Sequence, residues 1–306
     1  ARVGGAGGIL GGSRGSTLLG FVHAAVEPTT GMSLIGQAHG GALHVWTLEF
    51  GDKVVTNHES TTVELTLRNK WCATPCVTGH FEGVTDLAWE ASNGDYLLTV
   101  SGDQTCRLWA PIDTSLSSSD DNTSTWVELA RPQVHGYDLT TITSISKPEH
   151  RHLVVTGADE KEARAFDAPL MTTKLLRALV CSSDYMSDGL QRVERAYIPS
   201  LGLSNKASAD DGAEEDLGDC DEINSADTEK IKLPLERDLG AVSLWPEVRK
   251  LYGHNSELFC LTSTLTAQSS TEIDIAYKEV LVASSAKARD VQGASIRIWD
   301  VEKGKC

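Results

Sequence analysis

The sequence has no long hydrophobic run and little positive charge. No stretch reaches the about 18 consecutive apolar residues that a membrane-spanning helix requires, so no membrane contact is predicted. The 27 Lys and Arg residues are outnumbered by 43 Asp and Glu residues, which gives a net charge of −16. Because binding to phosphates over a broad surface requires clustered positive charge, this composition argues against a protein that grips nucleic acid in that way.

The cysteines form no recognisable site. There are seven, an odd number, and the only close pair, Cys72 and Cys76, has three residues between its members. This fits neither a disulfide framework nor a zinc knuckle. The glycine-dense segment GGAGGILGGSRG (4–15) lacks the GKS or GKT ending of a phosphate-binding loop. We therefore predict no cofactor and no metal, and a start of this composition indicates an internal piece of a longer protein.

Four segments of the chain share one pattern. Each has a β-rich apolar run, a turn of small or acidic residues and an alternating run that closes on an aromatic residue. The segments are 34–46, 97–109, 153–166 and 281–299. A further strand is predicted before three of them, at 84–89, 140–145 and 257–263. Each of these strands follows a Gly–His or His–Gly pair: Gly79-His80, His135-Gly136 and Gly253-His254.

Strand, turn and strand, with Gly–His before and Trp–Asp after, is the pattern of a WD40 blade. His80 and His135 are 55 residues apart, whereas one blade takes about 40–45. The polar segment DTSLSSSDDNTST (113–125) accounts for the excess as an inserted surface loop. The predicted fold is all-β and built from WD40 β-propeller blades.

His80, Ser101 and Asp103 are the residue types of a nucleophilic triad. In the blade pattern, however, Asp103 falls in the turn six residues before Trp109, and Ser101 on the strand before that turn. His80, Ser101, Asp103 and Trp109 are therefore predicted to form a structural tetrad, a hydrogen-bonded chain that holds one blade. The sequence contains no GxSxG nucleophile elbow. No catalytic residue is predicted, and an enzyme that uses these three side chains remains the alternative.

The other blades keep the pattern only in part. Phe166 replaces the closing Trp of the third blade, with Glu160 six residues before it, and the fourth has Gly293 where Asp is expected. The degenerate blade positions are Trp46, His135, Phe166, His254 and Trp299.

A long segment without blade pattern divides the chain. It holds a possible short helix at 168–180 and a run at 209–229 with ten carboxylates and no Lys or Arg, which leaves a net charge of about −6 for the rest. Such a run cannot bury enough apolar surface to fold. We predict the last blades of a first propeller at 1–167, a connection at 168–245 with a disordered acidic loop at about 208–230, and the first, incomplete blade of a second propeller at 246–306.

Four stretches resemble the Elongator complex subunit 2 family: ARPQVHGYDLTTITSI (130–145), GADEKEARAFDAP (157–169), IPSLGLSNKA (198–207) and LWPEVRKLYGH (244–254). SLGLSNKA and LWPEVRKLYGH are not part of the blade pattern. The chain departs from the family in the residues after His254, in its glycine-dense start and in its acidic loop.

The resemblance implies two WD40 propellers and a non-catalytic scaffold in the cytoplasm and nucleus. Its partners would be the large scaffold subunit and the radical-SAM catalytic subunit of Elongator, a complex that modifies carbon 5 of wobble uridine in transfer RNA. A WD40 adaptor outside Elongator, such as a substrate receptor of a ubiquitin ligase, is the alternative. Contact with transfer RNA would use a basic edge. The candidate residues of this edge are Arg131, Lys147, Arg151, Lys161 and Arg164. The candidates for partner binding are Arg131, Tyr137, Lys161 and Arg164.

Overall fold

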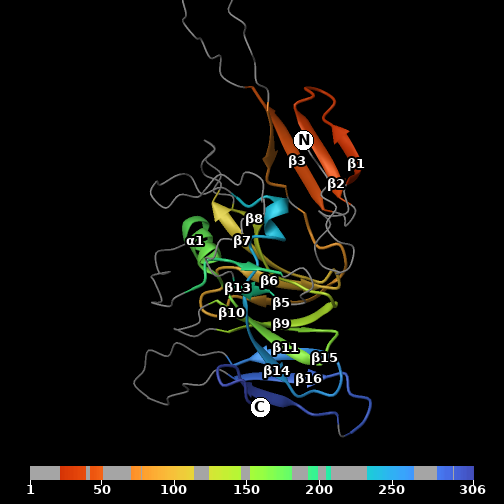
Figure 1. The fold of residues 1–306 in the computed structure, drawn as a ribbon, viewed down its shortest axis with the longest axis vertical. Coiled ribbons are helices and arrows are strands. Elements are labelled where there is room, and N and C mark those ends of the chain that lie inside the picture. The colour runs from red at the N-terminus through yellow and green to blue at the C-terminus, as the bar shows by residue number, and fades with distance from the viewer. Residues whose placement is uncertain are drawn as a thin grey trace, which may run out of the picture. The chain divides into compact units, whose positions relative to one another are not determined.

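The computed structural model describes residues 21–38, 42–50, 70–76, 78–113, 124–145, 152–180, 192–198, 205–207, 233–264, 281–291 and 293–306. These residues form antiparallel β-sheets with two short helices (Figure 1). The prediction of an all-β chain of blade-like sheets is confirmed. The glycine-dense start and the acidic run at 209–229 lie outside the described residues, as do Lys147 and Arg151.

The described strands fall into two compact units. The first unit holds one sheet of four strands in chain order: β1 (Phe21–Val26), β2 (Ser33–Ala38), β3 (Leu43–Glu49) and β4 (Lys70–Thr74). Trp46, the predicted closing residue, lies on β3, where the rings of Phe21 and His44 pack against its indole. The alternating run 43–49 thus forms a strand that closes on an aromatic cluster, as the blade pattern predicts.

The described residues of the second unit form three larger sheets and one sheet of two strands. One has the order β5 (Val84–Trp89), β6 (Leu97–Ser101), β7 (Thr105–Asp113) and β8 (Ser124–Val134). The next has the order β9 (Leu139–Ile145), β10 (Leu153–Ala158), β11 (Glu162–Asp167) and β14 (Glu247–Tyr252). The last consists of β15 (Leu258–Ser263), β16 (Leu281–Ala286) and β17 (Arg297–Asp300). The strands predicted from residue 84 onward are all present.

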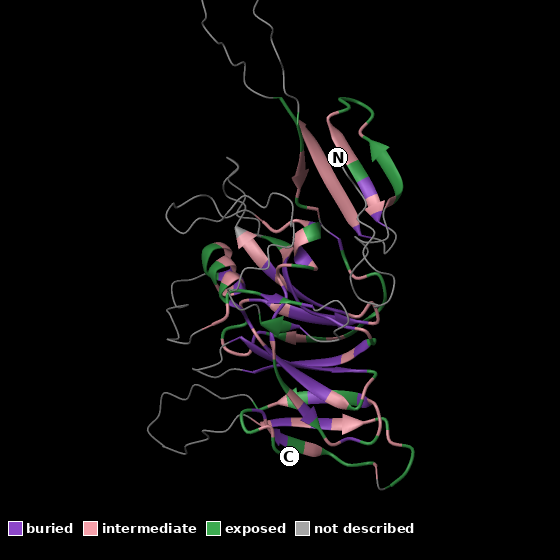
Figure 2. Cartoon of the chain, viewed as in Figure 1, coloured by how far each residue is buried: buried purple, intermediate pink, exposed green. Residues whose placement is uncertain are grey.

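The three larger sheets of the second unit are stacked, and their first strands β5, β9 and β15 lie side by side (Figure 1). Polar contacts join these strands: Asp86 Oδ2 accepts hydrogen bonds from Ile142 N and Thr141 Oγ1, and Thr141 Oγ1 accepts one from Leu261 N. Two clusters of buried apolar residues span these sheets, and Figure 2 shows that the strands of the stacked sheets are largely buried. Non-local packing of this kind is how neighbouring blades stabilise one another.

The segment 168–245 does not connect two propellers in the way predicted. β14 begins at Glu247 and pairs with β11, with Arg164 opposite Lys250, so this segment joins the third and fourth strands of one sheet. It contains α1 (Leu170–Leu179), where a short helix was predicted, then β12 (Ala196–Tyr197), β13 (Lys206–Ala207) and α2 (Glu236–Leu239). The proposed boundary before residue 246 therefore falls inside a sheet, and the division into two propellers stays a prediction. No helix among the described residues is long and apolar enough to cross a membrane.

Candidate functional site

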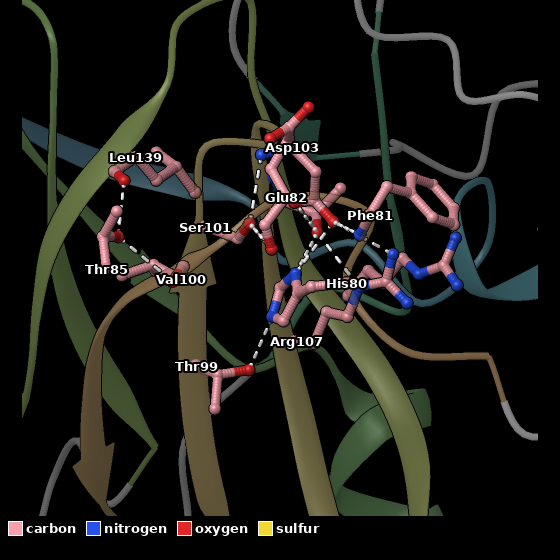
Figure 3. A network of polar contacts seen from close by, with 12 residues as sticks. His80, Phe81, Glu82, Thr85, Thr99, Val100, Ser101, Asp103, Arg107 and Leu139 are labelled. Carbon is pink, nitrogen blue, oxygen red and sulfur yellow. Dashed lines mark hydrogen bonds and ion pairs between the residues drawn. The ribbon is translucent and has the colours of Figure 1, made fainter. Parts of the chain in front are cut away.

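A chain of hydrogen bonds links β6 and β7 with the loop before β5, and Figure 3 shows its part from Thr99 through His80 to Asp103. Trp109 Nε1 donates to Thr99 Oγ1 at 2.9 Å, and Thr99 Oγ1 lies 2.7 Å from His80 Nε2. His80 Nδ1 lies 2.9 Å from Asp103 Oδ2. Because the Asp103 carboxylate can only accept, in the neutral ring the proton of His80 is on Nδ1, and Nε2 then accepts from the Thr99 hydroxyl. The four side chains form one continuous donor–acceptor series.

Ser101 is not a member of this chain, which corrects the predicted tetrad. Its hydroxyl donates to the carbonyl of Glu82 at 3.2 Å and accepts from the backbone N–H of Asp103 at 3.1 Å. Thr99 takes the place predicted for Ser101, so His80 has Thr99 on one ring nitrogen and Asp103 on the other. In a catalytic triad, one ring nitrogen of the histidine bonds to the hydroxyl of the nucleophilic serine. His80 makes no such bond to Ser101, so the arrangement is not a triad.

The strand register explains why Thr99 and not Ser101 contacts the indole. Side chains two residues apart point to the same face of a strand, so the pattern alone does not distinguish the two positions. In the β6–β7 pair, Leu97 lies opposite Trp109. Thr99 is two residues after Leu97, on the same face as the indole, whereas Ser101 is four residues after it, at the hairpin end. The choice between Thr99 and Ser101 required the cross-strand register, which the sequence pattern does not give.

Asp103 is the electrostatic centre of this chain. Burial alone would raise the pKa of its carboxyl, but hydrogen bonds from His80 and Thr105 and the nearby charge of Arg107 hold the pKa well below its usual range. The carboxylate also accepts from the backbone N–H of Phe81 at 3.2 Å. The loop that carries His80 is thereby fastened to the β6–β7 hairpin.

The second sheet repeats the arrangement with other side chains. His135 Nε2 lies 3.1 Å from Glu160 Oε1, which also accepts from Arg164 Nε at 2.6 Å. Burial raises the pKa of Glu160, but these hydrogen bonds and charges outweigh it and lower the pKa to about 2. Phe166, the predicted closing residue, is buried. Since Phe has no donor, Thr156, which occupies the register position of Thr99, bonds to Gln133 instead.

The third sheet has a shortened chain. Trp299 Nε1 donates to Ser284 Oγ at 2.7 Å, and Ser284 Oγ lies 2.7 Å from His254 Nε2. Ser284 is opposite Arg297, as Thr99 is opposite the arginine of its own sheet. Gly293, in the position where an acid was expected, contributes no carboxylate. This sheet therefore keeps the Trp–hydroxyl–His part of the series and lacks its acidic end.

A second polar feature, which the sequence analysis missed, ties the outer strand to each four-stranded sheet of the second unit. Arg107, two residues before Trp109, donates through Nη1 to Glu128 on β8 at 3.1 Å. Arg131 Nε also donates to Glu128, at 2.6 Å. Glu128 lies opposite Trp109 in the ladder, so an acid on the outer strand faces the closing aromatic residue.

The sheet with β14 has the same feature. Arg164, two residues before Phe166, donates through Nη1 to Glu247 at 2.8 Å, and Glu247 lies opposite Phe166. Lys250, three residues after Glu247, is 3.8 Å from it. The arginine two residues before each closing aromatic was visible in the sequence and marks this network.

The predicted basic edge is not formed by the residues that the structure describes. Arg131 and Arg164 are buried and bond to glutamates, Arg131 to Glu128 on its own strand and Arg164 to Glu247 on β14. Tyr137 is exposed and its ring lies 5.7 Å from that of His135, and Lys161 is exposed. Of the candidates that the structure describes, Tyr137 and Lys161 are the exposed ones.

The segments outside the blade pattern meet at one buried residue. Asn205 Nδ2 donates to the carbonyl oxygens of Pro132 and Trp245, each at 2.8 Å. Trp245 N donates to Pro132 O at 3.0 Å, and Glu247 N donates to Asn205 O at 3.0 Å. Asn205 and Trp245 are both buried. This contact, the Asn205 clamp, fastens the connection 168–245 to the sheet edge where β14 begins.

Within the described ranges, no group of three or more His, Cys, Asp and Glu residues is placed to hold a metal ion. Four-stranded antiparallel sheets stacked through their first strands, with a Trp–Thr–His–Asp series, define a WD40-repeat protein with β-propeller blades.

Comparisons with known proteins identify the family. No family model matches the chain. It is 34% identical over 315 residues to Elongator complex protein 2 of Danio rerio and 33% identical over 313 residues to that of Homo sapiens, in both cases across 96% of this chain and 33% of the relative. Elongator complex protein 2 of Saccharomyces cerevisiae is 37% identical over 233 residues, 74% of this chain and 27% of the relative. The chain belongs to the Elongator complex protein 2 family and spans about a third of its relatives' length.

Solved structures of U3-55K and of the RRP9 WD40 repeats are also similar. They cover 92% of this chain and 49% and 48% of their own chains, with TM-scores of 0.31 and 0.32 and sequence identities of 8% and 9%. At these TM-scores the likeness does not establish a shared arrangement of the sheets.

Proposed function

We propose that the full-length protein is a non-catalytic scaffold subunit of the Elongator complex, required for carboxymethyl-type modification at carbon 5 of the wobble uridine of transfer RNA. The similarity to Elongator complex protein 2 across 96% of the chain carries this proposal. A general WD40 adaptor requires only blades, whereas the similarity here extends through the connection between β11 and β14.

The Asn205 clamp supports a specialised scaffold. Its members Pro132, Asn205 and Trp245 lie in three of the segments that resemble the family, and they converge on one buried point. A buried side chain that satisfies two backbone carbonyls fixes the path of both segments. The clamp therefore fixes the connection to the sheet at Asn205 and at its end beside Trp245, as a surface that recognises other subunits requires.

The proposed partners are the large scaffold subunit and the radical-SAM catalytic subunit. Transfer RNA contact, in this proposal, belongs to the assembled complex, because Arg131 and Arg164 are committed to buried ion pairs. Exposed Tyr137 and Lys161 are the candidates for partner contact. The proposed location is the cytoplasm and the nucleus.

The experiment is replacement of the native protein in cells, followed by mass spectrometry of transfer RNA nucleosides. Depletion should reduce carboxymethyl-type uridines, and the wild-type protein should restore them. Restoration by Ser101→Ala is also expected, because Ser101 bonds only to backbone groups. Unchanged modification after depletion contradicts the proposal and favours an adaptor outside Elongator.

The absence of catalysis is tested separately. The purified full-length protein, given transfer RNA, S-adenosylmethionine and acetyl-CoA, should form no modified nucleoside, and a fluorophosphonate probe should not label Ser101. Turnover by the isolated protein, or labelling of Ser101, contradicts the scaffold assignment.

A further inference from the structure

The connection between β11 and β14 exposes positive charge, although the chain as a whole has a net charge of −16. Between Ala168 and Ala207, the described residues expose four cations and a single carboxylate, that of Glu194. The cations are Lys174, Arg177, Arg195 and Lys206. In the described part of the chain these four side chains form no ion pair. The connection therefore carries a local positive surface on an acidic protein.

Two of these cations lie beside an exposed aromatic ring. In the pair of β12 and β13, Tyr197 is opposite Lys206, and residues directly opposite one another share a face of the sheet, about 5 Å apart. Arg195 is two residues before Tyr197, the spacing of side chains on one face of an extended chain. Tyr197 is 48% exposed, and both cations are exposed as well. The hairpin thus presents a ring between two positive charges.

The opposite face of this hairpin is fixed to the body of the second unit. Ala196 and Ile198 are buried in one apolar cluster with Val134 and Leu244. The Asn205 clamp holds the start of β13 through its bonds to two backbone carbonyls. Because both strands are anchored, little backbone ordering is required when the exposed side chains bind a ligand.

The helix α1 brings the other two cations to the same segment. Met171 N donates to Glu194 O at 3.2 Å, so the first turn of α1 lies against the residue before Arg195. Lys174 is about 4.5 Å further along the helix axis than Met171. Lys174 and Arg177 are three residues apart, which places them on one side of the helix. We call Lys174, Arg177, Arg195, Tyr197 and Lys206 the connection surface.

The acid at the start of β14 does not neutralise this surface. Glu247 N donates to the carbonyl of Asn205, next to Lys206, but the Glu247 carboxylate accepts from Arg164 Nη1 at 2.8 Å. This carboxylate is also 3.8 Å from Lys250 Nζ. It is thereby committed to the network that holds β14.

We propose that the connection surface binds a single-stranded nucleic acid, with one base stacked on Tyr197 and phosphates beside Arg195 and Lys206. Proteins that bind single strands combine a positively charged track with exposed aromatic side chains on which bases stack. Cations alone would suit any anion, whereas a ring between two cations matches a nucleotide, which has both a phosphate and a flat base. With four cations the contact is local, in agreement with the acidic composition, and it does not rest on the proposed scaffold role.

The acidic run of the same connection is the competing occupant. It follows Ala207 closely in the sequence, at 209–229, and has ten carboxylates and no aromatic residue. It matches the charge of the four cations but offers no base to stack on Tyr197. The experiment therefore includes a variant in which 209–229 is replaced by a Gly/Ser linker of equal length.

The test measures binding of the full-length protein to fluorescently labelled 12-nucleotide oligouridylate and oligothymidylate at several salt concentrations. For single strands, log K falls with log salt by about 0.7 per phosphate contact, so four contacts predict a slope of about −2.8. The double variant Arg195→Gln/Lys206→Gln should flatten this slope by about 1.4. The matched control Lys161→Gln/Arg289→Gln removes two exposed cations outside the connection and should keep the slope.

Substitutions of Tyr197 separate stacking from charge. Tyr197→Leu keeps the charge and removes the ring, so affinity should fall at least about fivefold. Tyr197→Phe keeps the ring and should bind as the wild type does. Because Tyr197 is on the exposed face of the hairpin, neither change disturbs the buried cluster.

The outcomes separate the proposal from its alternatives. Binding that is weakened by Arg195→Gln/Lys206→Gln and by Tyr197→Leu, and by neither control, supports it; tighter binding of oligouridylate then assigns RNA, and equal binding assigns single strands of both kinds. No binding by wild type, or equal weakening by both double variants, overturns it. Unchanged affinity in Tyr197→Leu also overturns it and indicates a surface for anions in general, such as an acidic peptide.

Binding that is seen only after replacement of 209–229 overturns the proposal as well and assigns the connection surface to the acidic run. None of these measurements requires the Elongator complex. A failure of the proposed scaffold role would therefore leave them unchanged, and a failure here would leave that role intact.

Discussion

Replacement of Thr99 by valine removes one hydroxyl and keeps the shape of the side chain. The hydroxyl is the only group between the indole of Trp109 and the ring of His80, at 2.9 and 2.7 Å, and Thr99 is 7% exposed. Valine cannot accept or donate, so Trp109 Nε1 and His80 Nε2 both lose their partner. Each orphaned buried group costs about 1–3 kcal/mol. Because Trp109 is only half-buried, about 2–4 kcal/mol is expected in total.

Backbone propensity does not contribute to this effect, since Val and Thr both favour strands. The matched control is Ser101→Ala, which removes one hydroxyl from the same strand and costs about 1 kcal/mol, the usual net value of a hydrogen bond. Hydrogen exchange of peptides covering β6 and β7 gives the free energy of local opening. Thr99→Val should raise the opening equilibrium at least about 30-fold. An effect of Ser101→Ala equal to or larger than that of Thr99→Val refutes the assignment of Thr99.

Four further predictions follow from individual contacts. Arg164→Met removes the arginine that bonds to the largely buried Glu160 and Glu247 and should cost about 3–5 kcal/mol, seen as faster exchange in β14, with exposed Lys161→Met as the neutral control. The folded state lowers the pKa of Glu160 from 4.5 to about 2, so its contribution to the free energy of unfolding is present above pH 4.5 and lost as pH falls toward 2. The urea midpoints of wild type and Glu160→Gln should therefore converge over that range. A constant difference between them contradicts the pairing. Gly157→Ala places a Cβ 2.7 Å from Thr141 Cγ2 and 3.1 Å from Leu258 Cδ1, and should cost about 1–3 kcal/mol, whereas Gly83→Ala, which meets nothing within 4 Å, should be neutral. Asn205→Ala should release the connection 168–245, measured as faster limited proteolysis there while the exchange of β6 and β7 is unchanged.

The strands could be predicted because their signals are local. The alternation in 97–109 and 153–166 and the spacing of the Gly–His pairs depend on residues close in sequence, and the strands formed there with ends within a few residues of the prediction. The inserted polar loop was predicted for the same reason, since β7 ends at Asp113 and β8 begins at Ser124, at its two borders.

The sequence predictions that were wrong concern side-chain contacts that depend on which strands pair and in which register. Thr99 and Ser101 share a face, so the sequence could not tell which reaches Trp109 until the register was known. Arg131 appeared to be a surface cation because its partner Glu128 was not recognised as the acid opposite the closing aromatic. The pairing of β14 with β11 spans the whole connection, and no local pattern records a partner so distant in sequence.

The most direct test of the central proposal is quantitative mass spectrometry of the full-length protein purified by affinity from cells at native expression. The account predicts that the large scaffold subunit and the radical-SAM subunit of Elongator co-purify in amounts comparable to the protein itself. Arg164→Met, which loosens β14, should reduce their recovery more than Arg289→Met does, since Arg289 is exposed and lies outside that network. A folded protein that purifies without either subunit contradicts the account.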